Sequence, residues 1–238
     1  MNRVCLITGA SRGLGLSLAK EYKNRGYTVI GVARRTQPLE ELKQAGTLDD
    51  FVTCDLTSEA SIDTFTNELA SRHDHLDVLI HNAGIQKLME ITDSDDYPAL
   101  VREEMQVNFL APVQITVALL PLLIKSRATI IIIGSLLQIG PKREAPGYCA
   151  SKAALGSWCA NLREQLKRTP VKVVEVIPGL IKTTMSAKAQ ERGVDPDLLA
   201  REIFEGSAKP RIVLTGAKFP WAISRVLPGV VRKKLLQS

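Results

Sequence analysis

The segment from Gly9 to Gly15 constrains the fold of this chain more than any other. Its three glycines, at positions 9, 13 and 15, lie between a short apolar run, Val4 to Ile7, and an apolar helical pattern that reaches Tyr22. A glycine-rich turn between a first strand and a helix places backbone N–H groups and a helix N-terminus against a pyrophosphate. The sequence therefore predicts a dinucleotide-binding turn; the alternative is a tight turn without a ligand.

Strand patterns alternate with helical patterns along the rest of the chain. With Val4 to Ile7, the strand patterns are Tyr27 to Ala33, Phe51 to Leu56, Leu76 to His81, Thr129 to Ile133 and Val171 to Ile177. The main helical patterns are Ser58 to His73, with Ser58 as N-cap, Asp96 to Leu123 and Tyr148 to Lys167. This alternation predicts an α/β fold with a doubly wound parallel sheet. Because nothing marks a domain boundary, we expect the 238 residues to form a single domain.

The end of the second strand indicates which dinucleotide binds. In this kind of fold, an acidic residue there would bind the ribose 2′-hydroxyl, and an arginine would bind a 2′-phosphate. The chain has no acid at this point but has Arg34, and Arg12 lies in the glycine turn. Guanidinium groups suit phosphate, so the pair predicts NADP(H). The alternative is that both arginines are only solvated.

Polar and turn residues follow the other predicted strands. They are Asp55, Asn82 with Ala83 and Gly84, Ser135, and Pro178 with Gly179. Because the carboxyl ends of parallel strands lie at one edge of a sheet, we expect these residues to lie together with the glycine turn. Asn108 lies inside an apolar helix, where it is unfavourable unless it has a partner.

Tyr148 and Lys152 are four residues apart at the start of a helical pattern, so they share one face. A positive charge beside a phenol would lower its pKa by about 2–3 units. Tyr148 would then act as a general acid or base, with Ser135 donating a second hydrogen bond to the substrate oxygen. The alternative is a half-buried tyrosine beside a solvated lysine.

Together, these motifs resemble the short-chain dehydrogenase/reductase (SDR) family over nearly the whole chain, including the thirteen residues from Ser135 to Tyr148. The resemblance implies a single-domain Rossmann fold of about seven strands, the seventh at Ile212 to Leu214, and an NADP(H)-dependent carbonyl reductase or alcohol dehydrogenase. It implies a catalytic tetrad of Asn108, Ser135, Tyr148 and Lys152. It also implies that the cofactor-binding residues are Gly9, Ser11, Arg12, Gly13, Leu14, Gly15, Arg34, Asp55, Leu56, Asn82, Ala83, Gly84, Tyr148, Lys152, Pro178, Gly179, Ile181 and Thr183. A catalytically idle NADP(H)-binding sensor or scaffold is the alternative.

The region after the sixth strand corresponds to the family's substrate lid, residues 184–208. Apolar residues there and beside Ser135 predict a largely apolar pocket for a small carbonyl or alcohol substrate, although they could be plain packing. They are Met185, Leu198, Leu199, Ile203, Phe204, Leu136, Leu137 and Ile139. Substrate identity, reaction direction and stereochemistry stay open.

The tail, residues 218–238, is basic and amphipathic but is interrupted by Pro228-Gly229. Packing on its own or a neighbouring subunit is expected, and contact with an anionic membrane is the alternative. Although the net charge is +6, we expect a solvated surface and no nucleic-acid partner.

Four well-separated cysteines predict reduced thiols in a cytoplasmic protein. His73, His75 and His81 lack partners at ligand spacing, so we expect no metal site. We also expect no membrane-spanning segment. In the resembled family two helices, here Asp96 to Leu123 and Tyr148 to Lys167, build a subunit interface, which predicts a homodimer or homotetramer.

Overall fold

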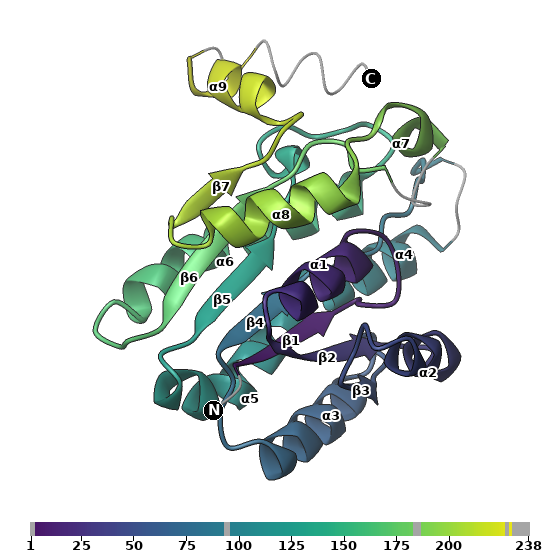
Figure 1. Ribbon diagram of the computed structural model, residues 1–238. Helices are drawn as coiled ribbons and strands as arrows, with labels where there is room; N and C mark the ends of the chain where they lie inside the picture. The colour runs from purple at the N-terminus through teal and green to yellow at the C-terminus, as the bar shows by residue number, and fades with distance from the viewer. Residues whose placement is uncertain (1–2, 93–95, 183–186, 227–228, 230–238) are drawn as a thin grey trace.

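A parallel sheet lies at the centre of the structure, a computed structural model that describes residues 3–92, 96–182, 187–226 and 229 (Figure 1). Within these residues seven strands pair in the order β3-β2-β1-β4-β5-β6-β7, and each neighbouring pair is parallel. The strands are β1 (Val4–Thr8), β2 (Thr28–Ala33), β3 (Asp50–Thr53), β4 (Val78–His81), β5 (Thr129–Ile133), β6 (Lys172–Ile177) and β7 (Arg211–Val213). The predicted doubly wound α/β fold is therefore confirmed.

Strand ends differ from the predictions by a few residues, and β3 differs most. It was expected over Phe51 to Leu56 but ends at Thr53. The Asp55 carboxylate accepts hydrogen bonds from the Thr57 backbone N (3.0 Å) and Oγ1 (2.8 Å). Such a local turn around an aspartate competes with strand pairing, which explains the early end.

Helices cover both faces of the sheet (Figure 1). Neighbouring strand residues point to opposite faces, so Leu6 packs with α3, α5 and α6, and Ile7 packs with α1, α8 and Leu39 of α2. The helices are α1 (Gly13–Asn24), α2 (Thr36–Gln44), α3 (Glu59–Arg72), α4 (Tyr97–Met105), α5 (Ala111–Lys125), α6 (Pro146–Gln165), α7 (Ala187–Arg192), α8 (Pro196–Gly206) and α9 (Lys218–Val226). Ser58 caps α3 as predicted, because its side chain accepts from Ser61 N (3.3 Å).

A π-helical turn, Gln106–Leu110, joins α4 and α5 into one rod within the range predicted as a single helix. By length and composition alone, residues 97–125 could cross a membrane, contrary to the expectation that no segment would. The buried residues of α5, among them Ile115 and Leu119, pack in the core beneath the sheet. This packing accounts for the apolar composition without a bilayer.

Helix α8 lies in the region expected to form the substrate lid, but its buried face packs in the hydrophobic core. Leu199 and Ile203 are fully buried in the cluster that contains α1, whereas Leu198 is exposed. Phe204 stacks edge-on against Tyr22 of α1, with ring centroids 5.1 Å apart. The alternative of plain packing therefore holds for Leu199 and Ile203, while Met185 lies outside the described residues.

The described part of the tail forms α9. Arg211 lies over the Trp221 ring, with its Cζ 5.4 Å from the ring centroid, and Trp221 N donates to Ala217 O (2.9 Å). Phe219 is exposed. These contacts attach the start of α9 to β7.

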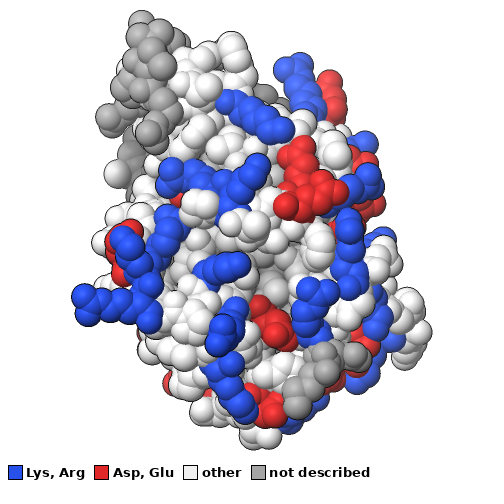
Figure 2. Space-filling view, turned by 60° about the vertical axis from the view of Figure 1, so that its left-hand side comes forward, with Lys and Arg blue, Asp and Glu red and all other residues white. Residues whose placement is uncertain are grey.

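Lys and Arg side chains are spread over the face shown in Figure 2, with fewer Asp and Glu among them. Acidic partners are interspersed, as in the ion pairs Lys167–Glu164 (3.3 Å) and Arg211–Glu175 (2.5 Å). All four cysteines are buried, and none of them forms a disulfide.

Candidate functional site

The glycine turn lies between the end of β1 and the start of α1, as predicted. Gly9 and Gly13 have positive φ angles of 69° and 55°, which L side chains rarely adopt. A Cβ on Gly15 would overlap the Gly9 carbonyl oxygen and the Asn82 side chain. The turn thus brings backbone close to the N-terminus of α1, and this cradle fits the pyrophosphate of a dinucleotide.

Asn82 holds this turn from β4. Its Nδ2 donates to the carbonyl oxygens of Thr8 (2.9 Å) and Gly9 (3.2 Å). In return, the Thr8 hydroxyl accepts from the backbone N of Asn82 and of Ala83, both at 3.1 Å. The Asn82-Ala83-Gly84 motif therefore supports the cradle by joining β4 to β1.

Two arginines predicted to bind the cofactor, one in the glycine turn and one after β2, are exposed. Arg12 lies in the turn, where Ser11 and the buried Leu14 are its neighbours, and Arg34 follows β2. The pKa of Asp55 is lowered mainly by the hydrogen bond from the Thr57 backbone N, with a smaller contribution from the charge of Arg34. Arg34 and Asp55 therefore lie close together, beside the buried Leu56.

The remaining predicted residues of this edge follow β6. Leu136 N donates to the Pro178 carbonyl oxygen (3.2 Å), which joins the segment after β5 to the end of β6. Gly179 packs against Gly216, and Ile181 forms an isolated bridge with Val194. Thr183, also predicted to bind the cofactor, lies outside the described residues.

Tyr148, Lys152 and Ser135 lie together, as the motif spacing predicts. Ser135 follows β5 and hydrogen-bonds to Tyr148, which lies in the first turn of α6. Lys152 Nζ is 5.8 Å from the centroid of the Tyr148 ring and donates to the Ile133 carbonyl oxygen (2.8 Å). Lys152 is buried, so the alternative of a solvated lysine is wrong.

The expected lowering of the Tyr148 pKa is not found. Burial raises the pKa of Tyr148 to about 12, and the hydrogen bond from Ser135 only partly opposes this. Burial lowers the pKa of Lys152 to about 8. Lys152 directs one N–H at a carbonyl and stands beside the ring rather than at the phenol oxygen, which explains why its charge does not offset the desolvation. The Tyr148 phenol is thus protonated at neutral pH.

Asn108 has the partners that its buried position requires. In the π-helical turn, its Nδ2 donates to Ile85 O (2.9 Å) and Ser151 Oγ (3.0 Å), and its Oδ1 accepts from Ile85 N (2.8 Å). A Cβ on Gly84 would lie 3.3 Å from the Asn108 Oδ1 and 3.7 Å from the Lys152 Nζ. Asn108 and Lys152 therefore meet at the Asn82-Ala83-Gly84 motif.

The sequence reasoning assigned no role at this centre to four polar residues around it. Gln138 donates to the buried Glu175 on β6 (2.8 Å) and accepts from Ser135 N (3.3 Å), which fixes the position of Ser135. Glu104 and His81 are also buried. A charged residue within an apolar strand or helix is the signal that could have identified Glu175 and Glu104.

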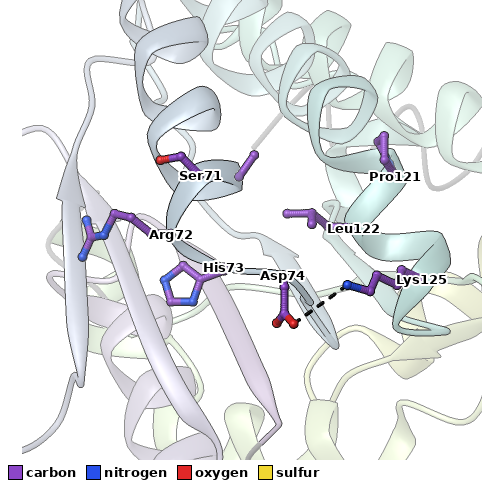
Figure 3. Close-up of a pocket in the computed structure, with 8 residues that line it drawn as sticks. Ser71, Arg72, His73, Asp74, Pro121, Leu122 and Lys125 are labelled. Carbon is purple, nitrogen blue, oxygen red and sulfur yellow. Dashed lines mark ion pairs between the residues drawn. The ribbon is translucent and has the colours of Figure 1, made fainter.

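A surface hollow at the opposite edge of the sheet is a separate feature (Figure 3). It lies between the C-terminal ends of α3 and α5 and includes Arg72, His73 and Lys125, with Lys125 3.9 Å from the Asp74 carboxylate. Basic residues are expected at helix C-termini, where they stabilise the last carbonyl groups. Arg72, His73 and Asp74 of this hollow come before the first residue of β4, whereas Asn82 follows its last residue. The hollow therefore lies at the other end of the strand and is not part of the candidate site.

The fold and the arrangement at the carboxyl edge of the sheet define an α/β protein of the doubly wound class, in which the half-buried Tyr148 lies beside the buried Lys152 and Asn108. A family model described as short chain dehydrogenase matches residues 3–193. The chain belongs to this family, and its members include oxidoreductases.

Relatives and solved structures agree with this assignment. An uncharacterised oxidoreductase, DltE, of Bacillus subtilis is 34% identical over 192 residues, covering 80% of this chain and 76% of the relative. A fatty acyl-CoA reductase of Acinetobacter baylyi is 33% identical over 205 residues, covering 84% and 70%. The crystal structure of a metagenomic short-chain oxidoreductase in complex with NADP has a TM-score of 0.77 and 25% identity, covering 89% and 96%.

Proposed function

We propose that this protein is an NADP(H)-dependent oxidoreductase of the carbonyl reductase or alcohol dehydrogenase type, with Tyr148 as the acid/base. The single observation that supports this most is the position of the half-buried Tyr148 beside the buried Lys152, with Ser135 hydrogen-bonded to the phenol. In the proposal, the bound nicotinamide supplies or accepts the hydride. The chain's own residues hold the substrate oxygen and move its proton.

Tyr148 and Ser135 would share the substrate oxygen. Because burial keeps the phenol protonated, Tyr148 can donate a proton to a carbonyl oxygen that gains charge. Ser135 Oγ accepts from Leu137 N (3.1 Å), so its lone proton is the one it directs at the Tyr148 phenol, and this proton would turn to the substrate oxygen when that oxygen binds between them. Two donors at one oxygen stabilise the charge that develops in the transition state.

Lys152 and Asn108 would restore the proton on Tyr148. Lys152 uses one of its N–H groups on Ile133 O (2.8 Å), which leaves two others. With a pKa lowered to about 8, Lys152 can exchange a proton near neutral pH. Asn108, held by Ile85 and Ser151, stays in one orientation beside it.

The cofactor choice, NADP(H) over NAD(H), rests on charge at the adenosine end. Arg12 and Arg34 are exposed there, and Asp55 already accepts two hydrogen bonds from Thr57. A 2′-phosphate would find two guanidinium groups, whereas NADH would leave them without an anion. The metagenomic neighbour is in complex with NADP, which supports the same choice.

An apolar carbonyl compound is the proposed substrate class. Leu88, Ile91 and Leu180 are exposed, and they follow the carboxyl ends of β4 and β6, where ligands bind in such sheets. A relative is a fatty acyl-CoA reductase, which is consistent with an apolar substrate. Three further apolar residues follow Ser135 directly after β5: Leu136, Leu137 and Ile139.

We also propose a homodimer or homotetramer in the cytoplasm. An exposed apolar stripe runs along α5 from the residue directly before it. Its members are seven residues apart and so lie on one face of the helix: Leu110, Val117 and Ile124. A second copy would bury this stripe. Sedimentation that finds only monomer at micromolar concentration would contradict the assembly.

Turnover of NADPH against a panel of carbonyl compounds, for the unchanged protein and for Tyr148→Phe, tests the proposed reaction. We expect Tyr148→Phe to bind NADPH with unchanged affinity but to lose most turnover, because only the phenol hydroxyl, which carries the proton, is removed. Full turnover by Tyr148→Phe would show that another group supplies the proton. NADPH binding without oxidation of NADPH by any carbonyl would favour the sensor or scaffold instead.

A further inference from the structure

A buried carboxylate that is not one of the proposed catalytic residues lies next to Gly147, the residue before Tyr148. Glu104, on α4, is fully buried. Its Oε1 accepts a hydrogen bond from Lys87 N (2.7 Å), whereas its Oε2 has no hydrogen-bond partner among the residues that the structure describes. A buried polar atom without a partner is costly, so its presence here calls for an explanation.

Glu104 lies against the first turn of α6, immediately before Tyr148. A Cβ added to Gly147 would overlap the Glu104 Oε2, so only glycine allows this approach. The described first turn of α6 contains no acidic residue, and its N-cap, Ala145, makes no side-chain hydrogen bond. Glu104 is therefore a buried carboxylate that lies at the positive end of α6 and comes from another helix.

Charges around Glu104 come from three elements. Burial raises its pKa; the hydrogen bond from Lys87 N and the Lys87 charge lower it, and Glu103 raises it. On α6, the charge of Glu104 contributes to raising the pKa of Tyr148 and of Cys149. The Lys87 ammonium forms an ion pair with Glu103. Its charge is therefore shared between Glu103 and Glu104 and does not fully neutralise Glu104.

We propose that Glu104 is a positioning residue that joins the loop 84–92 to the first turn of α6 and acts on the proton affinity of Tyr148 across this contact. The proposal rests on the proposed function of Tyr148. At the alkaline pH at which Tyr148 ionises, Glu104 is a carboxylate, and its charge opposes the formation of the tyrosinate. Glu104 thus makes the tyrosinate that would accept the proton in alcohol oxidation harder to form.

Titration of the Tyr148 phenolate by ultraviolet difference absorbance, taken as the unchanged protein minus Tyr148→Phe, measures this effect without substrate or cofactor. Glu104→Gln keeps the size of the side chain and an acceptor for Lys87 N but removes the charge. We expect the Tyr148 midpoint to fall by about one pH unit, since a nearby like charge shifts a pKa by about that much or more. The acidic limb of kcat/KM for alcohol oxidation should move to lower pH by the same amount.

Two further variants separate this effect from a loss of structure. Glu104→Met removes the charge and fills the volume, so it should lower the Tyr148 midpoint as Glu104→Gln does, even if Glu104→Gln folds poorly. Glu103→Gln removes the neighbouring charge, which pairs with Lys87 on the outside of α4, and should leave the midpoint unchanged. A merely structural Glu104 would change thermal stability and leave the midpoint in place.

Two results overturn the proposal. One is an unchanged Tyr148 midpoint in folded Glu104→Gln or Glu104→Met, and the other is an equal shift in Glu103→Gln. Failure of the proposed function is seen separately, as full turnover by Tyr148→Phe. The difference titration still reports the Glu104–Tyr148 coupling in that event.

Discussion

Asn108 and Ile85 are joined by a pair of hydrogen bonds, in which the Asn108 side-chain amide donates to Ile85 O (2.9 Å) and accepts from Ile85 N (2.8 Å). The side-chain amide of Asn108 thus makes the two backbone hydrogen bonds that a neighbouring strand would otherwise make to Ile85, which lies in the loop after β4. This pairing ties the loop to the rod formed by α4 and α5 at the point where the α-helical hydrogen-bonding pattern changes.

Replacing Asn108 by alanine would leave the Ile85 N–H and C=O without partners. We expect Asn108→Ala to lower the free energy of unfolding by about 2–3 kcal/mol, since each unpaired buried group costs about 1–3 kcal/mol. Urea unfolding measures this. Asn161→Ala, which removes an exposed amide bonded within its own helix, should cost far less. Equal costs would show that the Ile85 pairing contributes little.

A methyl group at Gly15 should damage the cofactor cradle. It would overlap the Gly9 carbonyl oxygen and the Asn82 amide, and both belong to the turn. We expect Gly15→Ala to lose about 2 kcal/mol of stability, as overpacking does, and to weaken NADPH binding at least about tenfold. Gly46→Ala, at φ 72° with open space around it, is the control. It should cost only about 1 kcal/mol and leave NADPH binding intact.

Arg34 should decide between the two nicotinamide cofactors. We expect the unchanged protein to bind NADPH about thirtyfold to a thousandfold more tightly than NADH, which corresponds to about 2–4 kcal/mol. Arg34→Asp should invert the preference, because a carboxylate accepts from a ribose hydroxyl and repels phosphate. Binding titrations of both cofactors at one salt concentration measure this.

Lys20→Asp serves as the control for the cofactor prediction. It makes the same change in net charge on the exposed side of α1 and should keep the preference for NADPH. Equal dissociation constants of NADPH and NADH in the unchanged protein would show that neither Arg12 nor Arg34 reads the phosphate.

His81 should make the protein less stable in mild acid. Burial lowers its pKa to about 3, with the Lys152 charge adding to the effect, whereas the unfolded chain has the ordinary value of 6.5. Unfolding below pH 6.5 therefore takes up a proton. The stability that this histidine contributes is fully present above pH 6.5 and is lost as the pH falls towards 3, at about 1.4 kcal/mol per unit.

Urea unfolding at pH 7 and pH 5 measures the effect of His81. The unchanged protein should lose about 2 kcal/mol more than His81→Gln over this interval. Glutamine keeps a polar atom near the Thr116 hydroxyl, which is 2.8 Å from His81 Nε2. The same loss in both proteins would mean that other groups cause the acid sensitivity.

The strands and the main motifs could be predicted from the sequence because their signals are local. The run Ile130 to Ile133 is apolar throughout, and Thr129 to Ile133 is β5 as predicted. Ser135, Tyr148 and Lys152 have a fixed spacing along the chain, so their proximity follows from one strand, one loop and one helix.

Contacts between distant segments were beyond the sequence reasoning. Nothing local indicates that Ser151 is a partner of Asn108, or that Glu104 approaches Gly147. The Tyr148 pKa depends on how completely the fold removes water, and this is why a pairwise charge argument gave the wrong direction. The role of Leu199 and Ile203 likewise depends on where α8 docks.

The π-helical turn Gln106–Leu110 constrains the length of the chain at this point. Such a turn contains one residue more than α-helical geometry would need. Deleting one residue within the turn would return the rod to α-helical geometry, but it would change the position of Asn108 relative to Ile85. Deleting one residue in the regular part of α4 or α5 would instead rotate everything on one side by about 100° relative to the other. Either Glu104 would then leave the start of α6, or Ile115 and Leu119 would leave the core. Insertions and deletions of single residues should therefore be tolerated in the loop 84–92 far better than within α4 or α5.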